Sequence, residues 1–92
     1  MKTILEEAKE IVVDRRGSDS ERNYGSFSEG MKRATMIFNG MTGLDIETKD
    51  MYAALVALKL SRESYHHKRD NLVDACGYLQ GLDDLYNDID RG

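Results

Sequence analysis

The chain has 92 residues, which leaves room for one domain with a modest hydrophobic core, and we expect a single domain over residues 1–92. Its net charge of −4 argues against sequence-independent binding to duplex nucleic acid, because such binding needs a basic face. No apolar run approaches the roughly 20 residues of a membrane span. We therefore expect a soluble protein without a membrane partner.

The first residues do not have the pattern of a secretion signal. The stretch MKTILEE turns acidic where a signal peptide would continue with apolar residues, so we expect a cytoplasmic location. The single cysteine, Cys76, has no partner for an internal disulfide and falls in an apolar helical stripe. We interpret it as a core residue rather than a reactive thiol.

The first predicted helix spans about residues 3–14. Thr3 and Glu6 have the spacing of a capping box, and apolar residues follow at helical intervals, at Ile4, Leu5, Ala8, Ile11 and Val12. The next segment, 15–26, loses this periodicity and is rich in glycine, serine and charge. We predict a flexible loop there.

A second helix is predicted over residues 27–41. Ser26 or Ser28 can cap its beginning, and Gly40 and Gly43 permit a turn at its end. The apolar residues on its helical period are Phe27, Met31, Ala34, Ile37, Phe38 and Met41.

Two longer helices are predicted over residues 48–65 and 70–89. The first is apolar around most of its circumference until Lys59 and Arg62, so we expect it to be the central helix. The second offers a stripe to the core, formed by Leu72, Val73, Cys76, Leu79, Leu82, Leu85 and Ile89.

The predicted fold class is therefore all-α, with about four helices in a compact bundle. Four short helices bury little apolar surface within one chain. The methionine and phenylalanine side chains on the second helix would therefore remain exposed to water unless another chain packs on them. We expect a homo-oligomer, at least a dimer.

Basic residues gather near the turn between the last two helices. Lys59 and Arg62 are three residues apart on one helix, and the turn itself reads His66-His67-Lys68-Arg69. This pattern suits a phosphate group near a helix N-terminus. A structural salt bridge explains Lys59 and Arg62 equally well, and adjacent histidines are poorly spaced for zinc.

Two further places could contact a nucleotide. The predicted loop carries Arg16 and Tyr24, which offer a cation and a stacking ring, although solvated loop charge is the commoner explanation. Tyr78 could stack on a base, but packing over the core is the interpretation we favour.

Asp70 and Asp74 are one helical turn apart, a spacing that can bridge a magnesium ion. The alternative is that Asp70 caps the helix N-terminus and Asp74 is solvated or paired. The sequence has no Walker loop, dinucleotide fingerprint or nucleophilic triad. Binding and metal-assisted hydrolysis are the chemistries left.

Several pieces of the sequence carry a family resemblance, which covers Arg16 to Leu82. They are Arg16, Tyr24-Gly25, Gly43-Leu44-Asp45-Ile46, Asp50, Lys59, Arg62 and the block HKRDNLVDACGY over residues 67–78. Through these residues the chain resembles a family of small, mostly uncharacterised phage and prophage proteins that are often found near phage nucleotide-metabolism genes. A phage-encoded protein would act in the host cytoplasm.

The segment DNLVD over residues 70–74, followed by an apolar helix, is also similar to the Glu-Glu-Leu-x-Asp helix of MazG-like all-α nucleoside triphosphate pyrophosphohydrolases. That similarity implies magnesium as cofactor, held here by Asp50, Asp70 and Asp74. Where those enzymes have a second carboxylate-rich helix, this chain has Asp50 and then Lys59 and Arg62. Cations in place of carboxylates favour an anion held without a metal.

Our leading hypothesis is a non-catalytic oligomer without a cofactor that binds a nucleotide or nucleotide-derived signal, with sequestration of a host defence signal as one use. The phosphates would meet Lys59, Arg62, His67 and Lys68, and the base would stack near Tyr24 or Tyr78. The alternatives are magnesium-dependent pyrophosphate release from a nucleoside triphosphate and a protein-interaction module.

Overall fold

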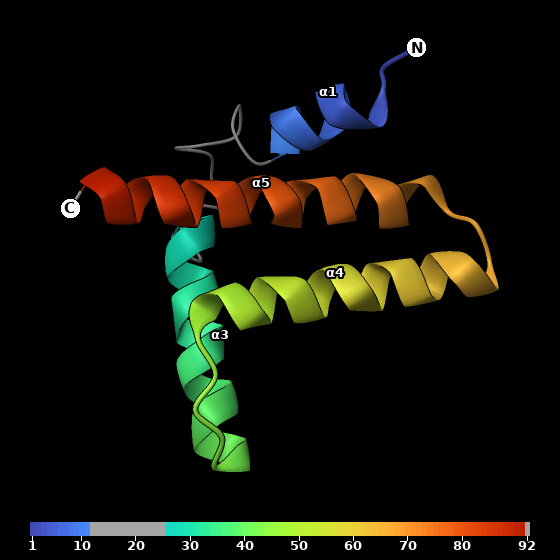
Figure 1. Ribbon diagram of the computed structural model, residues 1–92. Helices are drawn as coiled ribbons and strands as arrows, with labels where there is room; N and C mark the ends of the chain where they lie inside the picture. Colours follow the sequence, from blue (N-terminus) through green and yellow to red (C-terminus); the bar gives the residue numbers. More distant parts are fainter. Residues whose placement is uncertain (12–25, 92) are drawn as a thin grey trace.

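The computed structural model describes residues 1–11 and 26–91, and this part of the chain is all-α, which confirms the predicted fold class. It has four helices and no strand: α1 (Ile4–Lys9), α3 (Phe27–Thr42), α4 (Thr48–Tyr65) and α5 (Arg69–Arg91) (Figure 1). The predicted bounds that fall on these residues agree to within two residues. The end of the first predicted helix and all but Ser26 of the predicted loop lie outside the described residues.

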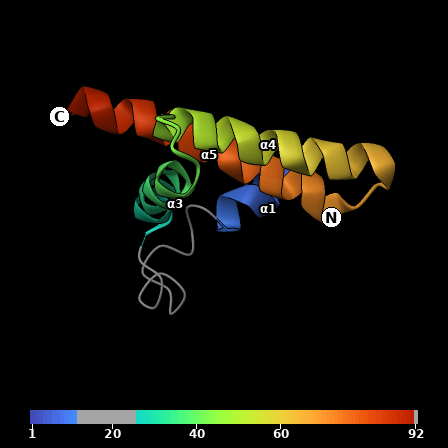
Figure 2. The same ribbon diagram turned by 90° about the horizontal axis from the view of Figure 1, so that it is seen from below.

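The four helices are arranged around α5. α4 and α5 form an antiparallel hairpin joined by residues 66–68, and α1 lies along the other side of α5 (Figure 1). α3 runs across the end of the hairpin where α4 begins, and Figure 2 shows α3 nearly end-on. α5 thus packs against each of the other three helices.

The helix ends follow local sequence signals. Thr3 and Glu6 form the predicted capping box at the start of α1. The hydroxyl oxygen of Ser26 accepts a hydrogen bond from the backbone N–H of Glu29 at 3.2 Å, which caps α3. α3 ends at Gly43, whose φ of 73° is in the left-handed region that glycine adopts without strain.

The core lies where the helices meet α5. Its buried apolar residues are Ala8, Met31, Tyr52, Val73 and Ala75. The ring of Phe27 packs edge-on against the ring of Tyr52 and is stacked with the ring of Tyr78, at centroid distances of 5.9 and 5.8 Å. Gly81 lets α5 approach these rings, because a Cβ atom there would lie 2.6 Å from ring carbons of Phe27 and Tyr52.

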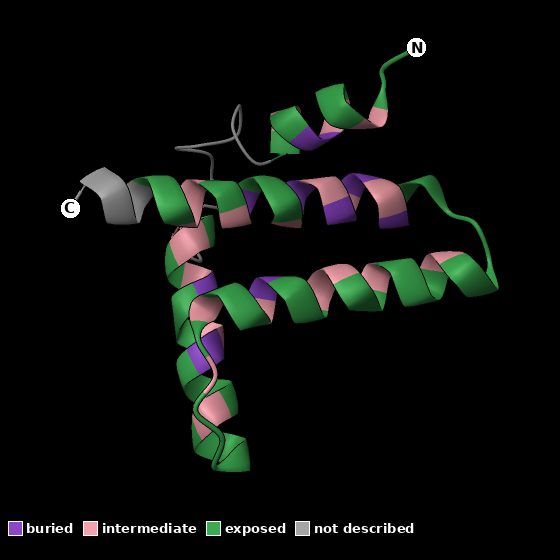
Figure 3. Cartoon of the chain, in the orientation of Figure 1, coloured by how far each residue is buried: buried purple, intermediate pink, exposed green. Residues whose placement is uncertain are grey.

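Two predictions about burial were wrong. The helix predicted to be central, α4, buries only Tyr52, and Leu58 and Leu60 are 43% and 50% exposed (Figure 3). Leu79, predicted to be in the core, is 52% exposed. An apolar circumference permits burial on every side, but burial also needs neighbours. Among the described residues α5 contacts three other helices, whereas α4 contacts α5 extensively and α3 less.

Among the described residues, no helix has both the length and the apolar character that crossing a membrane requires.

Candidate functional site

The turn that joins α4 to α5 is organised by one carboxylate, that of Glu63. It pairs with Nδ1 of His67 and accepts a hydrogen bond from the backbone N–H of Lys68 at 3.0 Å. The side-chain amide of Asn71 lies 3.5 Å from the same carboxylate. These partners lower the pKa of Glu63 below its ordinary value because they favour the charged form, and the hydrogen bond to His67 has the largest effect.

The same turn holds an open depression, which we call the α4–α5 corner. It has a volume of about 760 Å³ and is lined by Ser61, Arg62, Tyr65, His66, Lys68 and Asn71. This volume is in the range of small-molecule sites. None of the six lining residues carries a carboxylate, and two of them, Arg62 and Lys68, carry a full positive charge.

Tyr65 contributes an aromatic ring to the corner. It is the last residue of α4 and is 95% exposed, so it adds nothing to the core formed by the described residues. An exposed ring beside two cations supplies both of the contacts that a nucleotide offers, which are base stacking and phosphate pairing.

The structure separates the four basic residues that the sequence predicts at a phosphate site. Arg62 and Lys68 line the corner. His67 is turned to Glu63, and Nζ of Lys59 lies 2.9 Å from Oδ2 of Asp74 on α5. Lys59 therefore forms the salt bridge that was the alternative interpretation of its position.

Arg69, from the same basic run, is used to attach α1. Its Nε donates to Oε2 of Glu7 at 2.7 Å, and its guanidinium also donates to the carbonyl oxygen of Lys2. This residue stabilises the packing of α1 on α5 and does not line the corner.

The three predicted metal ligands are not brought together within the chain. Asp50 lies in the first turn of α4, where its carboxylate accepts from the backbone N–H of Glu47 at 2.9 Å. Asp70 lies in the first turn of α5, at the other end of the antiparallel hairpin, and Asp74 pairs with Lys59. Within residues 1–11 and 26–91, no group of three or more histidine, cysteine or acidic side chains is placed to hold a metal.

Of the two predicted base-stacking residues, the structure describes Tyr78, which does not line the corner. Tyr78 stacks on Phe27 and lines a small cavity of about 150 Å³ beside α1, which is below the usual size of a ligand site. Arg16 and Tyr24 lie outside the described residues.

Sequence reasoning missed Ser61 and Asn71, which line the corner, and also Glu63 and Tyr65. Glu63 could have been found from its spacing of four to His67, which places an acid and an imidazole on one helical face. Tyr65 gave no such signal, because a tyrosine at the end of a helix is as compatible with packing as with exposure.

The model of the family described as Domain of unknown function (DUF6378) matches residues 3–85. The matched span includes α1, α3, α4 and the part of α5 that forms the α4–α5 corner. No curated protein and no solved structure matches the chain significantly.

Proposed function

This chain belongs to the DUF6378 family, whose description names no activity, and we propose from the geometry of the α4–α5 corner that it binds a nucleotide or nucleotide-derived small molecule there. The observation that carries the proposal is the combination of Arg62, Lys68 and Tyr65, a residue that is 95% exposed, around one depression. A phosphate-bearing ligand with an aromatic base matches all three groups.

In this proposal Arg62 and Lys68 contact the phosphate oxygens. The guanidinium of Arg62 can donate two parallel hydrogen bonds, while the ammonium of Lys68 acts as a point charge. The N-terminal end of α5 begins next to them at Arg69 and adds a partial positive charge. His66 and the hydroxyl of Ser61 supply further donors at the rim.

The proposal moves base stacking from Tyr24 or Tyr78 to Tyr65, because Tyr78 is stacked on Phe27. It also leaves Lys59 and His67 outside the contacts to phosphate, since each has an acidic partner. Glu63 supports the site indirectly by holding the backbone of Lys68.

The direct test is calorimetric titration of the purified protein with nucleoside mono-, di- and triphosphates and cyclic nucleotides. We expect at least one of them to bind, with affinity that does not depend on magnesium. Removing a charge-assisted contact costs about 1.5 to 3 kcal/mol, so Lys68→Glu should weaken binding by about tenfold or more.

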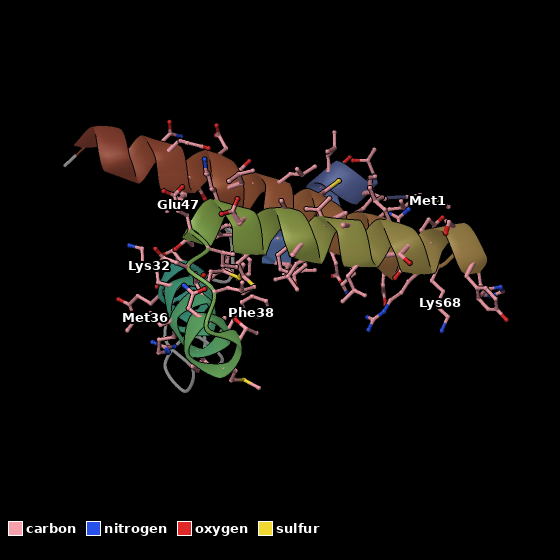
Figure 4. The ribbon with its side chains drawn as sticks, turned by 60° about the horizontal axis from the view of Figure 1, so that its bottom comes forward. Met1, Lys32, Met36, Phe38, Glu47 and Lys68 are labelled. Atoms are coloured by element: carbon pink, nitrogen blue, oxygen red, sulfur yellow. The ribbon has the colours of Figure 1, made fainter. Side chains whose placement is uncertain are left out.

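Lys32→Glu is the matched control, because Lys32 is an exposed lysine on α3, far from Lys68 (Figure 4). It changes the net charge by the same amount and should leave affinity within about twofold. Equal losses in the two variants would indicate a general charge effect and contradict a site at the corner. Tyr65→Ala should reduce the preference among bases, which separates stacking from phosphate pairing.

The same panel distinguishes the hydrolytic alternative. Magnesium-dependent release of pyrophosphate from a triphosphate would support that alternative and contradict simple binding. Sequestration of a signalling nucleotide would instead give tight binding with the ligand recovered intact.

A further inference from the structure

The chain has two histidines, which are neighbours in the turn between α4 and α5, and the structure gives them different surroundings. Nδ1 of His67 pairs with the carboxylate of Glu63. His66 is exposed and lines the α4–α5 corner, and among the side chains that the structure describes it forms no ion pair with an acid. One imidazole is therefore used within the chain, while its neighbour is open to a ligand in the corner.

The backbone at the end of α4 places His66 beside the two cations of the corner. Its N–H donates to the carbonyl oxygen of Arg62 at 3.1 Å, and its φ of −154° and ψ of 121° take the chain out of the helix. Lys68 follows two residues later, and its N–H donates to Glu63 at 3.0 Å. Hydrogen bonds on both sides of His66 thus hold it in the same turn as Arg62 and Lys68.

The other side chains that line the corner with His66 are positively charged or neutral. The titratable, charged and amide groups among them are Arg62 and Tyr65 from α4, Lys68 from the turn and Asn71 from α5. The acids closest in sequence, Glu63 and Asp70, are not in the lining. Glu63 is occupied by His67, so no carboxylate in the corner balances a positive charge at His66.

This arrangement couples the charge of His66 to the presence of an anion. In the free protein, two cations oppose a third positive charge in the corner. A bound phosphate group reverses this effect, because its negative charge favours the protonated imidazole. Histidine changes its charge between about pH 5 and 8, so a phosphate and a proton should strengthen each other's binding in this range.

We propose that His66 is a third contact to the phosphate group and that the α4–α5 corner binds its anionic ligand together with a proton. This inference rests on the proposed function, because it concerns the same site, and it adds regulation of that site by pH. The protonated form binds the anion more tightly, so affinity rises as the pH falls from about 8 to about 5.5. Three cationic groups suit an anion with two or more negative charges, such as a diphosphate.

The test is calorimetric titration of the full chain with inorganic pyrophosphate at about pH 8 and about pH 5.5. The parent and its variants are compared at the same pH and ionic strength, because pyrophosphate itself gains protons as the pH falls. His66→Gln keeps a hydrogen-bond donor and removes the charge. It should bind about tenfold more weakly than the parent at about pH 5.5 and within about twofold of the parent at about pH 8.

His67→Gln is the matched control, because it removes the same chemical group one residue away, where the imidazole is turned to Glu63. Its affinity should stay within about twofold of the parent at both pH values. His66→Lys gives the converse test, since lysine stays charged over the whole range. It should bind pyrophosphate several times more tightly than the parent at about pH 8. Both histidines are exposed, so circular dichroism should show the same helix content in every variant.

Equal losses in the two glutamine variants, or a loss in His66→Gln that is the same at both pH values, would overturn the inference. Absence of pyrophosphate binding at both pH values would also overturn it. The nucleotide titrations separate this failure from failure of the proposed function. Nucleotide binding with the same pH dependence in the parent and in His66→Gln would contradict the proton linkage alone. Pyrophosphate binding that depends on His66, without binding of any nucleotide, would support the linkage and contradict the nucleotide.

Discussion

Glu63 joins the end of α4 to the start of α5 through contacts to His67, Lys68 and Asn71. Its pKa is lowered below the ordinary 4.5, so its charged form is more stable in the folded chain than in the unfolded chain. The stability it contributes is complete above pH 4.5 and is lost as the pH falls through the folded pKa.

Glu63→Gln should therefore unfold at lower denaturant concentration than the parent near neutral pH. The difference should shrink as the pH falls below 4.5, because both proteins then lack the charge. Urea unfolding of both proteins at several pH values measures the difference between their unfolding midpoints. Asp45→Asn, at an exposed acid in the connection between α3 and α4, is the control and should show a small difference at every pH. A Glu63→Gln difference that did not depend on pH would contradict the role of its charge.

The ion pair of Lys59 and Asp74 links the two helices of the hairpin at 2.9 Å. Lys59→Glu should destabilise the fold by about 1 kcal/mol, because it places like charges together. Asp74→Lys should do the same, and the double variant should recover most of the loss. Urea unfolding of the four proteins gives the coupling energy. If the double variant lost the sum of the two single effects, the pair would not contribute to stability.

At the scale of elements, α5 is the helix on which the others pack, and Gly81 sets how closely it approaches Phe27 and Tyr52. Gly81→Ala should destabilise the fold by about 1 to 3 kcal/mol, since the new methyl group overpacks the contact. Gly40→Ala is the control, because a Cβ atom there meets nothing within 4 Å. It should be neutral or stabilise by up to about 1 kcal/mol through helix propensity. Thermal unfolding compares the two, and a stabilised Gly81→Ala protein would contradict the close approach.

The elements show which sequence signals are reliable in this chain. The caps at Thr3 and Ser26 and the end of α3 at Gly43 depend on residues a few positions apart, so local spacing predicted them. The central place of α5 and the exposure of Leu79 depend on which helices pack together. That information is not contained in the periodicity of any one helix.

The same distinction applies to the candidate site. The basic turn at residues 66–69 was visible in the sequence, and Arg62 and Lys68 do line one depression. The acidic partners of Lys59 and Arg69, which are Asp74 and Glu7, belong to other helices, so the sequence alone could not show that these two basic residues form ion pairs within the chain. The exposure of Tyr65 likewise follows from the position at which α4 ends.

At the scale of the whole molecule, the α4–α5 corner lies where α4 ends and α5 begins, and α3 crosses the other end of the hairpin (Figure 1). The α4–α5 corner presents cations on a chain of net charge −4. A local basic site on an acidic protein suits a small anion better than a long nucleic acid duplex, since the latter is repelled by the rest of the surface.

The most direct test of the central claim is a backbone amide NMR titration of the protein with the nucleotide that calorimetry identifies. The account predicts that the largest shifts cluster between Ser61 and Asn71, with little change on α3 near Lys32. Shifts centred on the cavity beside Tyr78, or on residues away from the α4–α5 corner, would contradict it.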